Sequence, residues 1–194
     1  MDIFLANNDS LSSEIEKQAQ VLYHQLYNLD YKNLDIPDYA KNYYKNRHSN
    51  RLFFSLQTAA VMLYNSLTHI QKPLHEVVLM EYGAGMGSLY MLAKLIGIGT
   101  VIYDDIDQEM AMGARTISNH LGINIDYYMV GSHDIVFKEL QVLNINCDVI
   151  LGRNVIEHIY NLDDFYKKAH TYQSNAIIYF STTANYYNIL MNIY

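Results

Sequence analysis

The chain has 194 residues, of which 51% are hydrophobic and 17% charged, a composition typical of one folded domain with an extension and not of a disordered chain. Its single cysteine, Cys147, excludes an intrachain disulfide and a cysteine-rich zinc site. The first 75 residues carry seven acidic and seven basic side chains, so the whole formal charge of −7 lies in residues 76–194. Because an acidic domain repels phosphate groups, this charge argues against nucleic acid as a partner.

The N-terminal part of the chain predicts two amphipathic helices, Leu11–Leu29 and Arg51–Ile70, because apolar residues recur there at three- and four-residue spacing. In the second helix the residues expected to face a core are Phe54, Leu56, Ala60, Leu63 and Leu67. Residues 38–50 between the helices have no firm assignment. Pro73 precedes a change of pattern, so we predict an N-terminal helical extension or lid, residues 1–75, and a main domain, residues 76–194.

After Pro73, short β-branched runs alternate with helical stretches. The expected strands are Val77–Tyr82, Thr100–Asp104, Ile125–Val130, Asp148–Leu151 and Ala176–Phe180. The expected helices are Ser88–Ile96, Gln108–Leu121, Asp134–Leu143 and Asn161–Thr171, the last with Asn161 as its N-cap. This alternation implies right-handed crossovers, so the predicted fold class is α/β, a doubly wound and mostly parallel sheet of Rossmann-like type.

The first of these strands runs into three glycines, Gly83, Gly85 and Gly87, directly before an apolar helix. Glycine suits a loop that needs positive φ and lets a ligand approach the backbone closely. The second strand ends in Asp104 and Asp105, and Asp105 follows Gly83 by 22 residues. An acid at this place can accept both hydroxyls of an adenosine ribose. The loop, its strand and the acid together predict a nucleoside-cofactor site, with Asp104 expected to be a solvated acid at the strand end.

Two cofactor classes use this geometry. A dinucleotide site favours glycine at the sixth loop position, where this chain has Ser88, and Glu81 would repel a pyrophosphate. An acid at the position of Glu81 suits a ligand with an amino group at that end, as in S-adenosylmethionine. A dinucleotide-binding oxidoreductase is therefore kept only as an alternative.

Four segments resemble motifs of the class I S-adenosylmethionine-dependent methyltransferases. Glu81–Gly87 resembles the first motif of that family, and Val101–Met110 is similar to the second. Gly131–Asp134 is similar to the adenine-side motif, and Cys147–Ile159 resembles the motif after the fourth strand in the small-molecule branch. The resemblance covers roughly residues 77–183.

The resemblance implies S-adenosylmethionine as the cofactor and a set of residues that bind it. These residues are Glu81, Gly83, Ala84, Gly85, Gly87, Asp105, Ile106, Ser132, His133 and Asn154. By this resemblance the glycines cradle the methionine part and Glu81 anchors its amino group. Asp105 takes the ribose, Ser132 and His133 flank the adenine, and Asn154 lies beside the sulfonium. The family often has Gly-Asp where this chain has Gly-Ser at position 132.

Methyl transfer from a sulfonium is a direct displacement, which needs a base only if the acceptor must lose a proton. His158 is the candidate catalytic base, although Glu157 and His158 also fit a structural role at the start of a helix. We expect a small-molecule acceptor, because the chain lacks the Pro-Pro motif that the resemblance associates with amino-methylating nucleic-acid enzymes. No metal is expected, since Asn154 and Asn185 stand where magnesium-dependent relatives have Asp.

The segment Lys41–Arg51 mixes basic and aromatic side chains. It fits either a surface that holds an acidic substrate or RNA by charge and stacking, or a solvated loop with a helix start. Tyr43 and Tyr44 within it fit either a cover over the site or a core or surface role.

The sheet of the resembling family normally has seven strands, and the last two form an antiparallel hairpin. This sequence predicts five strands followed by one apolar helical segment, Asn185–Tyr194, so the C-terminal hairpin is expected to be missing. The chain is then either a fragment or a reduced member of the resembling family. The exposed edge of the fifth strand is then an expected place for an oligomer contact or a partner chain. A second hypothesis is therefore a cofactor-binding but inactive partner subunit.

The first 20 residues contain four acids and no basic stretch before an apolar run, so no secretory signal is expected. No window reaches about 18 uninterrupted apolar residues, so no membrane span is expected either. Together with the single cysteine, these features predict a cytoplasmic location.

Overall fold

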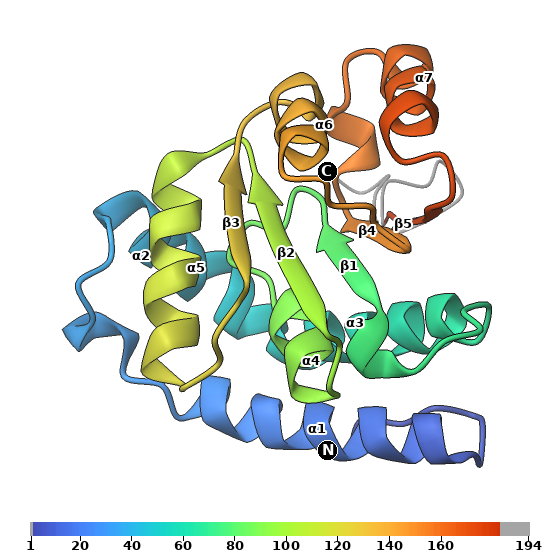
Figure 1. Ribbon diagram of the computed structural model, residues 1–194. Helices are drawn as coiled ribbons and strands as arrows, with labels where there is room; N and C mark the ends of the chain where they lie inside the picture. Colours follow the sequence, from blue (N-terminus) through green and yellow to red (C-terminus); the bar gives the residue numbers. More distant parts are fainter. Residues whose placement is uncertain (1, 183–194) are drawn as a thin grey trace, which may run out of the picture.

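A computed structural model describes residues 2–182 as one parallel sheet with helices on both faces (Figure 1). The strands are β1 Val78–Glu81, β2 Thr100–Asp105, β3 Tyr127–Val130, β4 Val149–Arg153 and β5 Ile177–Ser181. They lie in the order β3-β2-β1-β4-β5, and every neighbouring pair is parallel. The doubly wound α/β fold predicted from the sequence is confirmed.

Seven α-helices surround the sheet within residues 2–182. They are α1 Ser10–Tyr27, α2 Asp38–Tyr43, α3 Leu52–Leu67, α4 Leu89–Leu95, α5 Gln108–His120, α6 His133–Val142 and α7 Leu162–Tyr172. From β1 to β5, every strand and α-helix begins and ends within two residues of its expected place. Asn161 caps α7 as predicted, because its side chain accepts a hydrogen bond from the Asp164 backbone.

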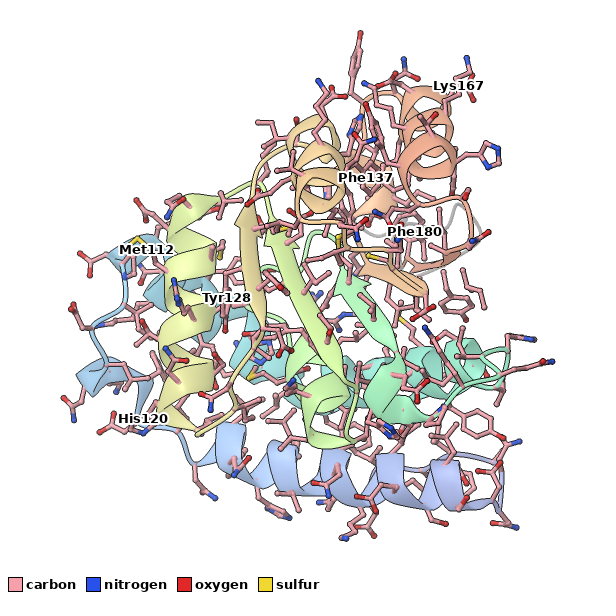
Figure 2. The ribbon with its side chains drawn as sticks, viewed as in Figure 1. Met112, His120, Tyr128, Phe137, Lys167 and Phe180 are labelled. Carbon is pink, nitrogen blue, oxygen red and sulfur yellow. The ribbon has the colours of Figure 1, made fainter. Side chains whose placement is uncertain are left out.

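The alternating side chains of the strands divide the core between the two faces of the sheet. On one face Leu79 and Val101 pack with α1, α3, α4 and α5, and on the other Met80 and Ile102 pack with α6 and α7. Figure 2 shows Phe137 on the side of α6, within the second of these clusters. Both faces are therefore buried, as a parallel sheet requires.

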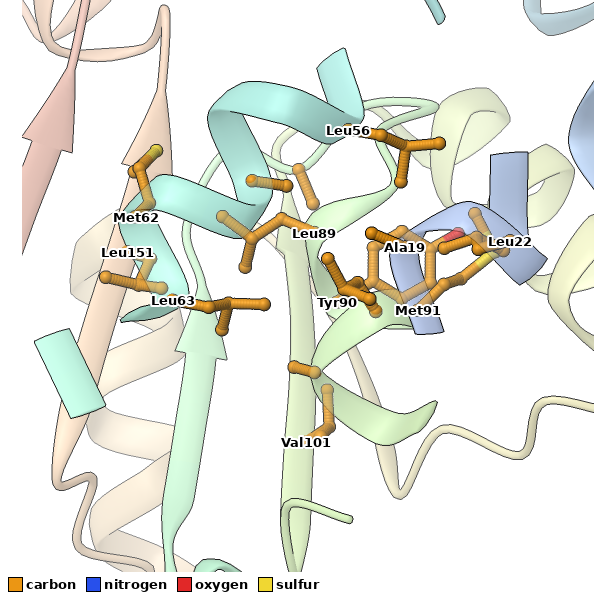
Figure 3. Close-up of a cluster of buried hydrophobic side chains, with 14 of the residues drawn as sticks. Ala19, Leu22, Leu56, Met62, Leu63, Leu89, Tyr90, Met91, Val101 and Leu151 are labelled. Atoms are coloured by element: carbon orange, nitrogen blue, oxygen red, sulfur yellow. The ribbon is translucent and has the colours of Figure 1, made fainter. Parts of the chain in front are cut away.

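The N-terminal helices share one hydrophobic core with the sheet. In Figure 3, Leu63 of α3 lies beside Leu89 of α4, and Leu22 of α1 lies beside Met91 of the same helix α4; each of these side chains is at most 1% exposed. The helix predicted over Arg51–Ile70 is confirmed as α3, but the prediction that Phe54 faces the core is wrong, because 69% of it is exposed. The buried stripe of α3 runs through positions 52, 56, 59 and 63, and position 54 lies on the opposite side of the helix. The expected domain boundary near residue 75 stays a prediction.

Residues 38–50, which had no firm assignment, form α2, a π-helical turn at Tyr44–His48 and most of a 3-10 turn, Ser49–Arg51, whose last residue was expected to begin the following helix. Tyr44 belongs to the core, where its hydroxyl donates to the Leu26 carbonyl over 3.1 Å. The segment is thus continuous with α3 and is not a loose linker.

Within residues 2–182 the sheet contains no antiparallel strand. The helical segment expected over Asn185–Tyr194 lies outside the described residues. None of the helices in the described part has the length and apolar character that a membrane crossing needs.

Leu63 and Phe54 provide a matched test of the packing of α3. We expect Leu63→Ala to lower the free energy of unfolding by about 2–5 kcal/mol, because it opens a cavity in the core that α3 shares with the sheet. Phe54→Ala, at an exposed position of the same helix, should change it by less than about 0.5 kcal/mol. Urea denaturation followed by circular dichroism measures both values. Equally small effects would show that α3 is not part of the core of the sheet.

Candidate functional site

A cavity of about 1120 Å³ lies at the carboxyl ends of the strands, over the place where the strand order reverses between β1 and β4. This is the position at which open α/β sheets bind ligands. The cavity is lined by every residue that the sequence predicts for cofactor binding or catalysis: Glu81, Gly83, Ala84, Gly85, Gly87, Asp105, Ile106, Ser132, His133, Asn154 and His158. They converge because the carboxyl ends of parallel strands share one edge of the sheet.

The glycine loop between β1 and α4 is held in a conformation that other residues resist. Gly83 has φ +64° and Gly85 has φ +54°, both in the left-handed region. A Cβ atom on Gly83 would also lie 2.3 Å from Val155 Cγ2. The loop is fastened to β2, since the Ala84 backbone N donates to the Asp104 carbonyl and the Tyr103 hydroxyl donates to the Gly85 carbonyl, each over 2.8 Å.

Asp105 connects this loop to the end of β2. Its Oδ2 accepts a hydrogen bond from the Gly85 backbone N over 2.7 Å, and its Oδ1 accepts one from the Asp107 backbone N over 2.9 Å. The side chain lines the cavity and the residue is 9% exposed. Burial raises the pKa of the carboxyl, while the two backbone hydrogen bonds oppose that rise. The remaining lone pairs of the two oxygens are available to a ligand.

Glu81, the last residue of β1, brings a second acid to the cavity in a nearly dry environment. It is 2% exposed, and its Oε2 accepts a hydrogen bond from the Tyr90 backbone N over 2.7 Å. Burial raises the pKa of this carboxyl to about 7, although the Tyr90 hydrogen bond and the charge of Arg153 act in the opposite direction. A cationic group bound beside Glu81 would therefore restore its charged form.

Asp104 differs from its expected state. The expectation of a solvated acid at the strand end is wrong, because Asp104 is 1% exposed and its Oδ1 has no hydrogen-bond partner among the described residues. Burial raises the pKa of Asp104 well above its ordinary value, and the nearby charge of Asp105 adds to that rise. The reason is that β2 continues to Asp105, so both acids stay within the covered part of the strand. Asp107, by contrast, caps α5 by accepting from the Glu109 and Met110 backbones.

Ser132 and His133 lie where β3 passes into α6. His133 Nε2 is 3.1 Å from Asp164 Oδ2. His133, Asp134 and Asp164 place possible metal-ligand atoms within 4.8 Å of one another. However, the Lys168 ammonium pairs with both acids and lies 2.5 Å from Asp164 Oδ2, so a cation of the protein itself already neutralises this group.

The segment after β4 brings Asn154 and His158 to the cavity. Asn154 has φ +52°, a conformation that asparagine tolerates better than most residues, and its backbone N donates to the Ser181 carbonyl over 2.7 Å. His158 ends a 3-10 turn, Ile156–His158. The expectation that Glu157 and His158 open a helix is wrong, because α7 begins only at Leu162.

One wall of the cavity comes from the segment that the sequence offered only as one of two alternatives, a cover over the site or a solvated loop; Tyr43 lines the cavity, whereas Tyr44 belongs to the core. This wall is formed by residues of the N-terminal segment: Tyr39, Asn42, Tyr43, Asn46, His48, Arg51 and Ser55. Buried Ser55 Oγ lies 3.1 Å from Ser88 Oγ, which joins α3 to the end of the glycine loop. The mixture of basic and aromatic residues in Lys41–Arg51 was the sequence feature that pointed to this wall. Hydrophobic periodicity, however, does not indicate which segment covers the strand ends.

No protein-family model matches the sequence, and no curated protein matches it either. Among solved structures, a Thermoplasma acidophilum protein, 1320, aligns with TM-score 0.50 and 17% identity over 90% of this chain and 77% of its own. A mutant of MtNAS in complex with S-adenosylmethionine aligns with TM-score 0.54 and 12% identity over 88% of this chain and 60% of its own. The plantazolicin methyltransferase BpumL in complex with SAH aligns with TM-score 0.51 and 20% identity over 87% of this chain and 62% of its own.

These identities show a shared fold. The chain has the fold of the class I S-adenosylmethionine-dependent methyltransferases, as its motifs predicted. It spans only about 60% of the length of MtNAS and of the plantazolicin methyltransferase.

The glycine loop can be tested by two alanine substitutions. Gly83 and Gly97 both have positive φ, but a Cβ atom on Gly97 would meet nothing within 4 Å. We expect Gly97→Ala to cost about 1–2 kcal/mol from backbone strain alone. Gly83→Ala should cost about 2–5 kcal/mol, because the overlap with Val155 adds to the same strain. Urea denaturation of both variants measures the difference, and equal costs would contradict the close packing of the loop against Val155.

The raised pKa of Glu81 predicts a pH-dependent stability. Because the folded pKa of about 7 exceeds the ordinary 4.5, the folded state binds more protons between these pH values. The free energy of unfolding therefore contains a favourable contribution from protonated Glu81 below pH 4.5, and this contribution is lost as the pH rises through 7. Glu81→Gln keeps the shape and removes the ionisation, so its stability relative to wild type should increase by up to about 3 kcal/mol from pH 5 to pH 8.

Urea denaturation of wild type and Glu81→Gln at pH 5, 6, 7 and 8 tests this expectation. A difference that stays constant with pH would mean that Glu81 is ionised throughout the range.

Proposed function

We propose that the protein binds S-adenosylmethionine in this cavity and transfers its methyl group to a small-molecule acceptor. The observation that supports this most is the pairing of two buried acids, Glu81 and Asp105, on either side of one strained glycine loop. Neither acid has an ion-pair partner within residues 2–182, so both suit a ligand that brings an ammonium group and ribose hydroxyls.

The glycine loop also supports the proposal. A Cβ atom on Gly87 would lie 2.6 Å from the Ala84 carbonyl oxygen, so the tight turn requires glycine at this position. Asp105 would accept the ribose hydroxyls, and Ile106, which is 76% exposed, would offer an apolar surface beside the adenine, flanked by Ser132 and His133. Asn154 would stand at the sulfonium end of the cavity.

When bound, S-adenosylmethionine supplies an activated methyl group, and the chain itself must align and shield it. Direct displacement depends on alignment and exclusion of water more than on acid–base groups. The N-terminal wall forms part of the cavity lining, and Tyr39 and Tyr43 within it are 55% and 39% exposed, so they would stand at its rim. His158 lines the same cavity and would take a proton from an acceptor hydroxyl or amine.

Calorimetric titration with S-adenosylmethionine and S-adenosylhomocysteine tests the proposal. We expect micromolar binding by wild type and a loss of about 1–3 kcal/mol in Asp105→Ala, because a buried charged hydrogen bond contributes about that much. Asp163→Asn, at an exposed position outside the cavity, is the matched control and should bind like wild type.

Three outcomes separate the alternatives. Binding followed by formation of S-adenosylhomocysteine with some acceptor supports an enzyme. Binding without turnover across an acceptor panel, together with co-purification of a second chain, supports the partner-subunit hypothesis. Binding of reduced nicotinamide dinucleotide in place of S-adenosylmethionine would overturn the proposal.

A further inference from the structure

The two walls of the cavity differ in charge. The wall at the strand ends carries four acids, Glu81, Asp104, Asp105 and Asp107, and Asp164 of α7 adds a fifth. The N-terminal wall, residues 39–55, brings no carboxylate to the cavity and contributes Arg51 and His48. Arg153 adds a second guanidinium from the end of β4. Arg51 and Arg153 therefore favour an anionic group in one part of the cavity, whereas the acids at the ends of β1 and β2 favour a cation and hydroxyl groups.

The two guanidinium groups are not engaged by the protein. Among residues 2–182, neither Arg51 nor Arg153 has an ion pair or a side-chain hydrogen bond. The charge of Arg153 acts on both Glu81 and His48, so it lies within electrostatic range of each. A guanidinium offers paired donors whose geometry matches a carboxylate.

His48 is a second and independent sign of a ligand on this wall. The residue is 5% exposed, and its Nε2 has no hydrogen-bond partner among the described residues. The ring packs against Tyr44 with centroids 5.0 Å apart, so its position is fixed by the core. Burial, with the charge of Arg153, lowers the pKa of His48 to about 3, which keeps the imidazole neutral. A buried polar atom without a partner is costly, and a ligand oxygen would remove that cost.

We propose that Arg51, Arg153 and His48, which line the same cavity as the glycine loop, form a carboxylate-binding subsite. Two sources can supply the carboxylate. One is the amino-acid end of S-adenosylmethionine, whose ammonium Glu81 would hold beside Arg153; this source rests on the proposed function. The other is a carboxylate on the acceptor. The cavity, at about 1120 Å³, exceeds the range of roughly 300–1,000 Å³ common for ligand pockets and has room for both.

The first arm of the test compares S-adenosylmethionine with decarboxylated S-adenosylmethionine, which keeps the sulfonium and the amine. Calorimetry is run on wild type, Arg153→Gln, Arg51→Gln and His48→Phe, which keeps a ring without nitrogen. If the subsite holds the cofactor carboxylate, the Arg153→Gln and His48→Phe changes weaken S-adenosylmethionine binding about tenfold or more and leave the decarboxylated form unaffected. Arg115→Gln is the matched control, since Arg115 lies over Tyr128 and away from the cavity.

The second arm uses benzoate and benzamide as probes on protein saturated with S-adenosylhomocysteine. A flat ring is chosen because Tyr39 and Tyr43 line the same wall. If the subsite holds the acceptor carboxylate, benzoate binds, neutral benzamide does not, and Arg51→Gln or Arg153→Gln reduces benzoate binding about tenfold or more. In both arms, binding is compared among variants whose thermal unfolding midpoint equals that of Arg115→Gln, so that unfolding does not account for a loss of binding.

The inference is overturned if folded Arg51→Gln, Arg153→Gln and His48→Phe bind all four compounds like wild type, or if wild type does not distinguish either carboxylate from its neutral counterpart. If wild type binds neither form of S-adenosylmethionine, the proposed function fails. In that case, benzoate titration of the protein without S-adenosylhomocysteine tests the carboxylate-binding subsite independently of the proposed function.

Discussion

The site depends on the hydrogen bonds that fasten the glycine loop to the end of β2. Asp105 accepts from the Gly85 backbone over 2.7 Å, and the Ala84 backbone donates to the Asp104 carbonyl over 2.8 Å. These bonds hold two left-handed glycines in place and aim the loop at the cavity. A neighbouring acid, Glu81, is positioned in the same way, because its bond to the Tyr90 backbone ties the end of β1 to the first turn of α4.

Burying the polar groups of this site costs free energy of folding. Burial raises the pKa values of Glu81, Asp104 and Asp105 together, and the Asp104 Oδ1 and His48 Nε2 atoms have no hydrogen-bond partner in the described part of the chain. Each buried group of this kind disfavours its charged or unpaired state. The extensive apolar packing on both faces of the sheet offsets these costs. Perturbed groups that gather in one cavity are typical of a functional site.

The N-terminal helices build part of the cavity as well as part of the core. α1 and α3 complete one face of the core, and the Ser55–Ser88 contact joins α3 to the glycine loop. Residues 39–55 are consequently a fixed wall of the cavity, with His48 held by its ring contact with Tyr44. The residues proposed to hold the cofactor lie at the strand ends, whereas this added wall brings His48 and Arg51 to the same cavity. Additions of this kind are a way in which one fold hosts many activities.

The sequence by itself determined the element order, the parallel sheet and the convergence of the candidate residues from Glu81 to His158. Strand and helix periodicity are local signals, and the ends of parallel strands meet at one edge in any such sheet. Only the tertiary structure decided that Asp104 is buried, that Phe54 is exposed and that residues 39–55 cover the strand ends. Burial and coverage depend on contacts between segments far apart in the chain, and local periodicity carries no information about which segments meet.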